Sequence, residues 1–218
     1  MLPQFHDPSL FQTALTHRSS LNESTVKISN ERLEFLGDAV LELATTVYLY
    51  NRFPEENEGV LSSYRSSLVK TTTLAGVAKT IGLDAQIRMS KGEEHGGGRA
   101  NQSLLADTFE AVLGAMYLDQ GYDVCVTFLE ENLFPLFDEI LEQQSYKDYK
   151  STLQEMVQSK GKSTPVYTTV GEEGPDHLKT FTVEVSVDGE PLATGQGKSK
   201  QDASQVAAKS ALEKMNKL

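Results

Sequence analysis

The sequence of 218 residues contains a single cysteine, Cys125, within the apolar run 124–129. One cysteine excludes an internal disulfide framework and a cysteine-based zinc site, and it fits a reducing compartment. We expect Cys125 to pack as a small hydrophobic side chain. Long apolar runs are also missing, since none approaches the ~20 residues that a membrane-spanning helix needs. The N-terminus lacks a basic start followed by an apolar segment, so we predict no secretory signal, no membrane association and a cytoplasmic location.

Positive charge is scarce as well. The chain has 20 Lys and Arg residues against 31 Asp and Glu residues, a net charge of −11 and a pI near 4.8. A protein that binds nucleic acid through its overall charge is expected to be basic. The deficit is uneven, because residues 1–147 carry a net charge of −10 and residues 148–218 one of −1. The acidic part suits a cation-dependent catalytic unit, in which a bound metal inverts the local field.

The hydrophobic pattern divides the chain near residue 145. Before that point, apolar residues recur with the helical period in the ranges 8–17, 31–51, 59–70, 72–82, 103–119 and 122–140. The glycine-rich range 92–102 predicts a flexible loop, and the polar range 143–146 predicts a short linker. We therefore predict a multi-domain chain, with an all-α domain over residues 1–144 and a second domain over residues 145–218.

The second domain follows a different pattern. Residues 148–160 and 202–215 have the helical period, whereas 166–170 and 181–187 alternate between apolar and polar side chains as half-buried strands do. Asp188 and Gly189 predict a hairpin turn that leads to a third strand over residues 191–197. The order α-β-β-β-α predicts a small α+β fold.

Three acidic residues lie in the first eight positions of the helix predicted over residues 31–51. At 100° per residue its apolar side chains form one stripe, made of Leu33, Leu36, Val40, Leu43, Ala44 and Val47. Glu31, Glu34 and Asp38 lie on the other side. Glu34 and Asp38 are one turn apart, and like charges at this spacing weaken a helix. A solvated acidic face is the simplest interpretation of this pattern.

A second acidic pair favours another interpretation. Asp107 and Glu110 lie three residues apart on the helix over 103–119, opposite its apolar side chains and beside Ala111 and Gly114, which are small enough to let another helix approach. Two carboxylates from each of two helices suit Mg²⁺, which prefers oxygen ligands. Such an ion can activate water and stabilise charge on a phosphodiester. The spacing alone leaves the solvated-face interpretation open, since Asp-x-x-Glu is common on helices.

These two helices and several shorter motifs resemble the ribonuclease III family. The matching segments are Ala14–Ser19, Asn30–Leu43, Glu58–Arg65, Lys91–Glu93, Asp107–Ala111 and Gly114–Asp119. The resemblance implies an all-α endonuclease domain that cuts double-stranded RNA with Mg²⁺, for which Mn²⁺ would substitute. It also implies a homodimer that leaves 5′-phosphate and 3′-hydroxyl ends and processes ribosomal RNA precursors and other structured transcripts.

The resemblance also assigns roles to individual residues. It implies a metal cluster made of Glu34, Asp38, Asp107 and Glu110, of which Asp38 and Glu110 match the catalytic acids. Glu31 and Glu58 match further acids that the family places near the cleft and the dimer contact. The apolar face of residues 31–50, with Phe35 and Leu36, must bury against something, and a two-fold interface is its natural partner. We expect His17 to pack or to hydrogen-bond rather than to catalyse.

The second domain resembles the double-stranded-RNA-binding domain, which reads duplex shape across two minor grooves. The matching contact positions are Gln154, Glu155, His177, Lys198 and Lys200. Where that family usually has a run of basic residues, this chain has Gln201 and Ser204, so we expect weaker binding to duplex RNA. An ordinary solvated helix end for the lysines and a turn cap for His177 are the alternatives.

Two other functions stay open. A non-catalytic scaffold that binds double-stranded RNA would keep both domains, and the four intact acids disfavour it. A metal-dependent phosphohydrolase acting on small nucleotides would need no RNA-binding domain, so the C-terminal domain disfavours this second alternative.

Overall fold

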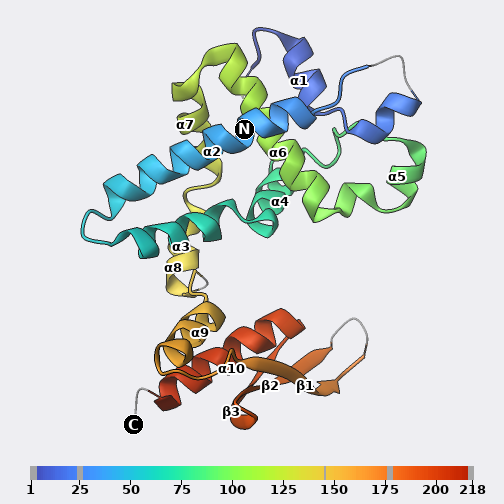
Figure 1. The fold of residues 1–218 in the computed structure, drawn as a ribbon. Helices are drawn as coiled ribbons and strands as arrows, with labels where there is room; N and C mark the ends of the chain where they lie inside the picture. The colour runs from blue at the N-terminus through green and yellow to red at the C-terminus, as the bar shows by residue number, and fades with distance from the viewer. Residues whose placement is uncertain (1–3, 24–26, 145, 176–178, 216–218) are drawn as a thin grey trace. The chain divides into compact units, whose positions relative to one another are not determined.

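The computed structural model describes residues 4–23, 27–144, 146–175 and 179–215. His177, a predicted RNA contact, lies outside these residues. The chain forms two compact units, Met1–Tyr146 and Lys147–Leu218 (Figure 1). Every helix among the described residues is too short or too polar to span a bilayer.

The first unit is built from helices, so the predicted all-α fold is confirmed. The helices are α1 (Pro8–Ala14), α2 (Glu31–Arg52), α3 (Glu58–Val69), α4 (Thr71–Thr80), α5 (Lys91–His95), α6 (Gln102–Gln120), α7 (Tyr122–Asn132) and α8 (Leu136–Glu142), with the 3-10 turns η1 (Arg18–Asn22) and η2 (Gly98–Ala100). Helix α6 passes through the middle of the unit and packs against α1, α2, α4 and α7 (Figure 1).

Helix α6 is buried around its whole circumference rather than along one face. Leu104, Phe109 and Gly114 point in three different directions around the helix, and all three are buried. Asp107 and Glu110, on the side opposite Leu105, Phe109 and Val112, are half-buried rather than fully solvated. The reason is that α2 covers the side of α6 from which the two carboxylates project.

Helix α2 has three faces instead of the two that were predicted. Leu33, Val40 and Ala44 are buried in the unit's core, whereas Leu43 and Val47 are 55% and 45% exposed. The wide apolar arc of the sequence therefore combines one buried face with a separate, exposed apolar stripe. A helical period cannot distinguish these two faces, because burial inside one chain and burial against another chain require the same side chains.

Two segments of the first unit differ from their predictions. The range 122–140 forms two helices rather than one, because α7 ends at Asn132 and α8 begins after Pro135. Proline has no backbone N–H to donate and its ring clashes with the preceding turn, so a helix ends before it. The range 92–102 contains the short helix α5 and the turn η2 in place of a flexible loop. The Ser90 side chain caps α5 by accepting a hydrogen bond from the Glu93 N–H.

The predicted linker also contributes to the first unit. The ring of Tyr146 packs edge-on against Tyr64, with centroids 4.7 Å apart. Tyr64 in turn contacts Phe53 and Phe137, so Tyr146 extends the aromatic part of the core. The sequence did not predict this contact, because a single aromatic residue in a polar segment forms no hydrophobic pattern.

The second unit confirms the predicted α-β-β-β-α order. Its elements are α9 (Tyr149–Ser159), β1 (Val166–Glu173), β2 (Thr180–Val187), β3 (Glu190–Gly197) and α10 (Lys200–Met215). The strands form one antiparallel sheet in the order β1-β2-β3, and α9 and α10 share a core with it. Asp188 and Gly189 have φ values of 55° and 81°, as the predicted two-residue hairpin turn requires.

Candidate active site and RNA-binding surface

Two glycines bring α2 and α6 into backbone contact. A Cβ atom added at Gly37 would lie 1.7 Å from the carbonyl oxygen of Glu110, and one added at Gly114 would lie 2.1 Å from that of Leu33. No side chain fits at either position, so the crossing depends on both glycines. The predicted close approach at Gly114 is confirmed. Because Gly37 lies between Glu34 and Asp38, this contact also sets where the α2 carboxylates project.

The crossing gathers three of the four predicted acids. Oxygen atoms of Glu34, Asp107 and Glu110, one from each, lie within 4.8 Å of one another. Asp38 is outside this close group and is exposed, one turn after Glu34. Its charge is nevertheless the first of the neighbouring charges that raise the pKa of Glu110, so Asp38 lies beside the group. We refer to these four residues as the acid cluster.

Burial and mutual repulsion disfavour the ionised carboxylates. Burial raises the pKa of Glu110 to about 8, with further contributions from Asp38, Asp107 and Glu34. The pKa of Glu34 is raised by burial and then by Asp107 and Glu31. Burial also raises the pKa of Asp107, which His17 and Arg18 oppose. The fold therefore holds negative groups together at an electrostatic cost that a cation would relieve.

The donor set fits a hard divalent cation. Mg²⁺ takes oxygen ligands at about 2.1 Å in an octahedron, in which opposite ligands are about 4.2 Å apart. Glu34, Asp107 and Glu110 offer three carboxylate oxygens within 4.8 Å of one another, so small side-chain rotations reach that spacing. Asp38 lies outside this group, but its charge acts on Glu110, so it would hold a water beside the ion or reach the ion as a fourth carboxylate only by changing its side-chain conformation.

The two accessory acids occupy different places. Glu31 accepts a hydrogen bond from Ser29 at 2.7 Å and pairs with Arg18 at 3.5 Å, next to the acid cluster. Glu58 begins α3, where it accepts a hydrogen bond from Ser62 at 3.0 Å. Helix α3 follows the C-terminal end of α2, whereas the cluster lies towards its N-terminal end (Figure 1). Within one chain, the structure does not bring Glu58 to the cluster.

Sequence reasoning missed two residues at the edge of the cluster. Arg18 opposes the raised pKa values of Glu34 and Asp107, so its charge reaches the site. Glu42 adds to the pKa rise of Glu110 and pairs with Arg65 at 2.8 Å. Two features of the sequence could have identified them. Arg18 lies in the family-like segment Ala14–Ser19, and Glu42 lies one helical turn after Asp38. His17 hydrogen-bonds Ser19 at 2.8 Å, as expected for a hydrogen-bonding role.

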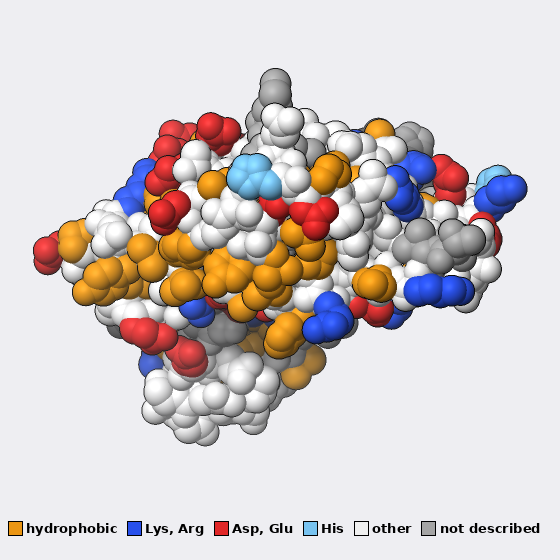
Figure 2. Space-filling view, turned by 90° about the horizontal axis from the view of Figure 1, so that it is seen from above, with side chains coloured by type: hydrophobic (Ala, Val, Ile, Leu, Met, Phe, Trp, Pro, Cys, Tyr) orange, Lys and Arg blue, Asp and Glu red, His pale blue; other side chains and the backbone are white. Residues whose placement is uncertain are grey.

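An exposed apolar stripe runs along α2 beside its acidic edge. Phe35 is 82% exposed, and Leu43, Val47 and Tyr50 continue the stripe at spacings of one or two turns. Tyr117 and Leu118 at the end of α6 are exposed as well. Figure 2 shows apolar side chains gathered in a band on one face. Exposed apolar surface of this extent marks an interaction site.

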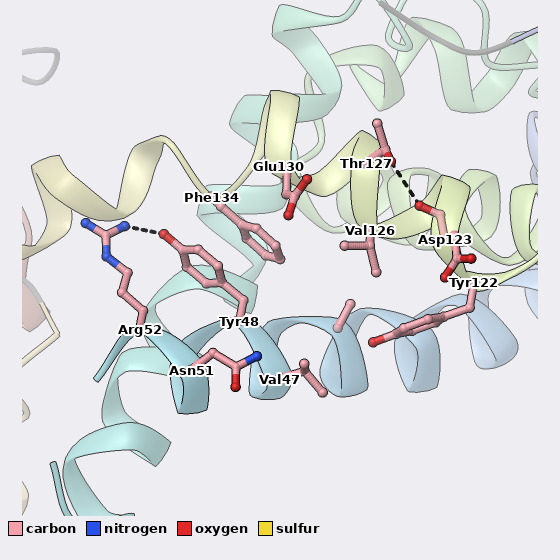
Figure 3. Close-up of a pocket in the computed structure, with 11 residues that line it drawn as sticks. Val47, Tyr48, Asn51, Arg52, Tyr122, Asp123, Val126, Thr127, Glu130 and Phe134 are labelled. Carbon is pink, nitrogen blue, oxygen red and sulfur yellow. Dashed lines mark hydrogen bonds between the residues drawn. The ribbon is translucent and has the colours of Figure 1, made fainter. Parts of the chain in front are cut away.

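A cavity of about 670 Å³ lies between α2 and α7, and none of the four acids lines it (Figure 3). Val47 and Tyr48 of α2 face Tyr122 and Val126 of α7 across this space (Figure 3). Arg52 bounds it where it donates a hydrogen bond to the Tyr48 hydroxyl. Because Val47 belongs to both, the cavity adjoins the apolar stripe rather than the acid cluster.

In the second unit, the four predicted RNA contacts that lie within the described residues are solvent-accessible. Gln154 and Glu155 are exposed on α9. Lys198 is exposed just before α10, and Lys200 is exposed in its first turn. Lys200 is also 3.2 Å from a carboxylate oxygen of Glu172 on β1, so an internal acid partly offsets its charge.

Gln201 lies on the same surface as Gln154. Both side chains line a cavity of about 340 Å³ together with Lys150 and Gln205. Asp148 also lines it, caps α9 and accepts a hydrogen bond from Gln205 at 2.9 Å. Gln201, one of the two positions where a basic residue was expected, therefore places a neutral carboxamide near Asp148 and Lys150, and weaker duplex binding stays a prediction.

Comparisons with known proteins agree with this architecture. The family model described as "Ribonuclease-III-like" matches residues 7–137, and that of the "Double-stranded RNA binding motif" matches residues 149–215. Ribonuclease 3 of Streptococcus thermophilus is 48% identical over 97% of this chain and 93% of that protein, and Ribonuclease 3 of Bdellovibrio bacteriovorus is 45% identical over 96% and 91%.

A solved structure points the same way. The nuclease domain of ribonuclease III from Campylobacter jejuni, in which one region is involved in dimer formation, aligns with a TM-score of 0.56 and 40% identity over 61% of this chain and 92% of that domain. With both domains matched in order, the chain belongs to the ribonuclease III family, a family of double-strand-specific endoribonucleases.

Proposed function

We propose that this member of the ribonuclease III family hydrolyses phosphodiester bonds in double-stranded RNA in a Mg²⁺-dependent reaction and leaves 5′-phosphate and 3′-hydroxyl ends. The observation that carries the proposal is the acid cluster at the α2–α6 crossing, in a chain that also holds a double-stranded-RNA-binding motif. Mn²⁺ is expected to substitute, because it accepts the same octahedral oxygen ligands. Precursors of ribosomal RNA and other structured transcripts in the cytoplasm are the proposed substrates.

The proposal gives each acid a task. Glu34, Asp107 and Glu110 would hold the ion, since their oxygens already lie within 4.8 Å of one another. The bound ion would supply an activated water and stabilise the charge that develops on the phosphodiester. Asp38 is exposed beside Glu110 and would orient the attacking water by accepting its hydrogen bond. Asp38 and Glu110 are the proposed catalytic acids.

We also propose a homodimer in which the α2 helices of two copies face each other. The apolar stripe of Phe35, Leu43, Val47 and Tyr50 needs a partner, and a two-fold interface lets the same surface cover itself. Because the acidic edge of α2 borders this stripe, the pairing would place two acid clusters in one assembly. Each cluster would then cut one strand of the duplex.

The second unit would supply duplex affinity. Gln154 and Glu155 on α9 would contact the minor groove, and Lys198 and Lys200 would meet phosphates near the start of α10. His177 is proposed as a further contact from the segment between β1 and β2. We assign catalysis to residues 1–144 and RNA binding to residues 145–218.

A substrate panel tests the proposed function. Long duplex RNA, single-stranded RNA and duplex DNA are incubated with the full chain, with and without Mg²⁺. The proposal requires cleavage of duplex RNA alone and only with the divalent ion. Binding of duplex RNA without any cleavage would point to a scaffold, and hydrolysis of mononucleotides in place of duplex RNA would point to a small-nucleotide phosphohydrolase.

A further inference from the structure

A polar cavity of about 500 Å³ opens beside the acid cluster. His17 and Arg18 line it from one side, Asn101 and Ser103 from the start of α6, and Asp107 joins it to the cluster. Its volume falls within the range of pockets that take a small ligand. A group bound here would therefore lie directly next to whatever the acid cluster holds.

Arg18 is the cationic side chain of this cavity, and stability does not explain its position. Its side chain is 72% exposed, and its Nη1 lies 3.5 Å from Glu31. Exposed ion pairs of this length add little to folding stability. Its charge does reach the site, because it opposes the rise in the pKa values of Glu34 and Asp107.

The backbone that carries Arg18 is held firmly. The N–H of His17 donates to the carbonyl oxygen of Arg88 at 2.9 Å. The Ser19 hydroxyl contacts His17 Nδ1 at 2.8 Å and accepts a hydrogen bond from the Ser90 N–H at 3.0 Å. Arg18 thus projects from an anchored turn, which fixes where its guanidinium can reach.

We propose that this cavity binds the phosphodiester group next to the one that is cut, with Arg18 as its charged contact. This inference rests on the proposed function. A guanidinium matches two phosphate oxygens with parallel N–H donors. A strand that approaches the acid cluster needs such a cation, because the carboxylates repel its phosphates.

The other lining groups suit the same nucleotide. Within the described part of the chain, His17 Nε2 and the Ser103 hydroxyl make no hydrogen bond, so both are available to a ligand. Glu93 also lines the cavity, and its carboxylate can only accept hydrogen bonds. It would meet a ribose 2′-hydroxyl, which can donate, rather than a phosphate.

The loss of the Arg18 charge should weaken the contact with RNA but strengthen metal binding, so the two roles can be told apart. Removing the positive charge of Arg18 leaves the acid cluster more negative, so a divalent cation should bind it more tightly. Slower cleavage by Arg18→Gln at saturating Mg²⁺ would therefore not come from a weakened metal site.

The test pairs protein variants with altered RNA in a double-mutant cycle. Full-length wild type, Arg18→Gln and Arg18→Lys are given duplex RNA in which one phosphate near the cut is replaced by an uncharged methylphosphonate, one position at a time. Arg88→Gln is the matched control, because the exposed Arg88 side chain lines a different cavity without any of the four acids, and the substitution keeps the backbone carbonyl that binds the His17 N–H. Thermal unfolding checks that each variant is folded.

The expected losses follow from one charge-assisted contact. Arg18→Gln should cut unmodified RNA about 10- to 100-fold more slowly at saturating Mg²⁺, Arg18→Lys should lose less, and Arg88→Gln should match wild type. Wild type should lose a similar factor with the methylphosphonate at one adjacent position. With the methylphosphonate at that position, Arg18→Gln should cut the RNA no more slowly than it cuts unmodified RNA.

Two results would overturn the assignment. One is that Arg18→Gln cuts RNA at the wild-type rate. The other is that the rate losses caused by Arg18→Gln and by the methylphosphonate multiply at every position tested. A second measurement repeats the cycle without cleavage. It compares the duplex affinity of Glu110→Gln with that of the double variant that also carries Arg18→Gln. Failure of wild type to cut unmodified duplex RNA would instead contradict the proposed function itself.

Discussion

Among single residues, Glu110 shows how the packing of α2 against α6 changes the acidity of a proposed metal ligand. Its carboxyl is half-buried at the helix crossing, and burial together with Asp38, Asp107 and Glu34 raises its pKa to about 8. In the unfolded chain the same group has the ordinary value of 4.5. Between pH 4.5 and about pH 8, Glu110 therefore keeps its proton in the folded protein and has lost it in the unfolded chain.

The metal-free protein should therefore become less stable as the pH rises. The folded state binds more protons than the unfolded state in this window, so the contribution of Glu110 is fully present below pH 4.5 and is lost as the pH passes through about 8. Urea unfolding in the presence of EDTA between pH 5 and 9 measures the effect. Glu110→Gln should show a smaller fall, and Mg²⁺ should restore wild-type stability at high pH. Parallel curves for the two proteins would contradict the shifted pKa.

Sequence alone located most of the acid cluster. Helical spacing placed Glu34 with Asp38 and Asp107 with Glu110, and the structure brings three of the four within 4.8 Å. It did not reveal Arg18, because a position in a short turn has no period that would place it beside helices distant in sequence. Nor did it show the half-burial of the carboxylates, which depends on how closely two helices cross.

At the scale of elements, the α2–α6 crossing is the most constrained contact of the first unit. Gly37 and Gly114 each face a backbone carbonyl oxygen of the other helix. The sequence predicted both helices and a small residue at the contact. It did not predict that the apolar arc of α2 is divided between a buried and an exposed face, or that Pro135 ends the helix predicted over 122–140.

Gly114→Ala should destabilise the protein and slow cleavage. The added methyl group would overlap the Leu33 carbonyl, so the helices must separate at a cost of about 1–3 kcal/mol or more, and the carboxylates would move apart with them. Gly76→Ala is the control, because no atom lies within 4 Å of its added Cβ and alanine favours the helix by up to about 1 kcal/mol. Urea unfolding compares the two, and equal stability of Gly114→Ala and wild type would show that the crossing is looser than described.

At the scale of the whole molecule, the exposed stripe of α2 predicts assembly. Sedimentation at micromolar concentration should give a species of twice 24.0 kDa for wild type and the 24.0 kDa monomer for Phe35→Glu. Phe35 is 82% exposed, so this change should leave the monomer folded. Val206→Glu, at an exposed apolar position of α10, should remain dimeric. A wild-type protein that sediments only at 24.0 kDa would refute the dimer.

The division of labour between the two units predicts how salt affects cleavage. A chain that ends after Tyr146 keeps the contact with Tyr64 and should cut duplex RNA at low salt with ample Mg²⁺, but fail at physiological salt where binding is limiting. Gln201→Lys in the full chain should tighten duplex binding, because it adds a cation beside Gln154. Cleavage rates are measured against salt for all three proteins. Superimposable curves for the full and shortened chains would show that the second unit supplies no RNA affinity.

If the acid cluster cuts double-stranded RNA with the help of Mg²⁺, then Glu110→Gln should lose most of the activity. The change keeps the size of the side chain but removes one charged ligand, so several kcal/mol of transition-state stabilisation should be lost. Across a series of Mg²⁺ concentrations the variant should cut duplex RNA at least about a hundredfold more slowly than wild type. Duplex binding, measured alongside, should be unchanged. Near-normal cleavage by Glu110→Gln at ordinary Mg²⁺ concentrations would contradict the account.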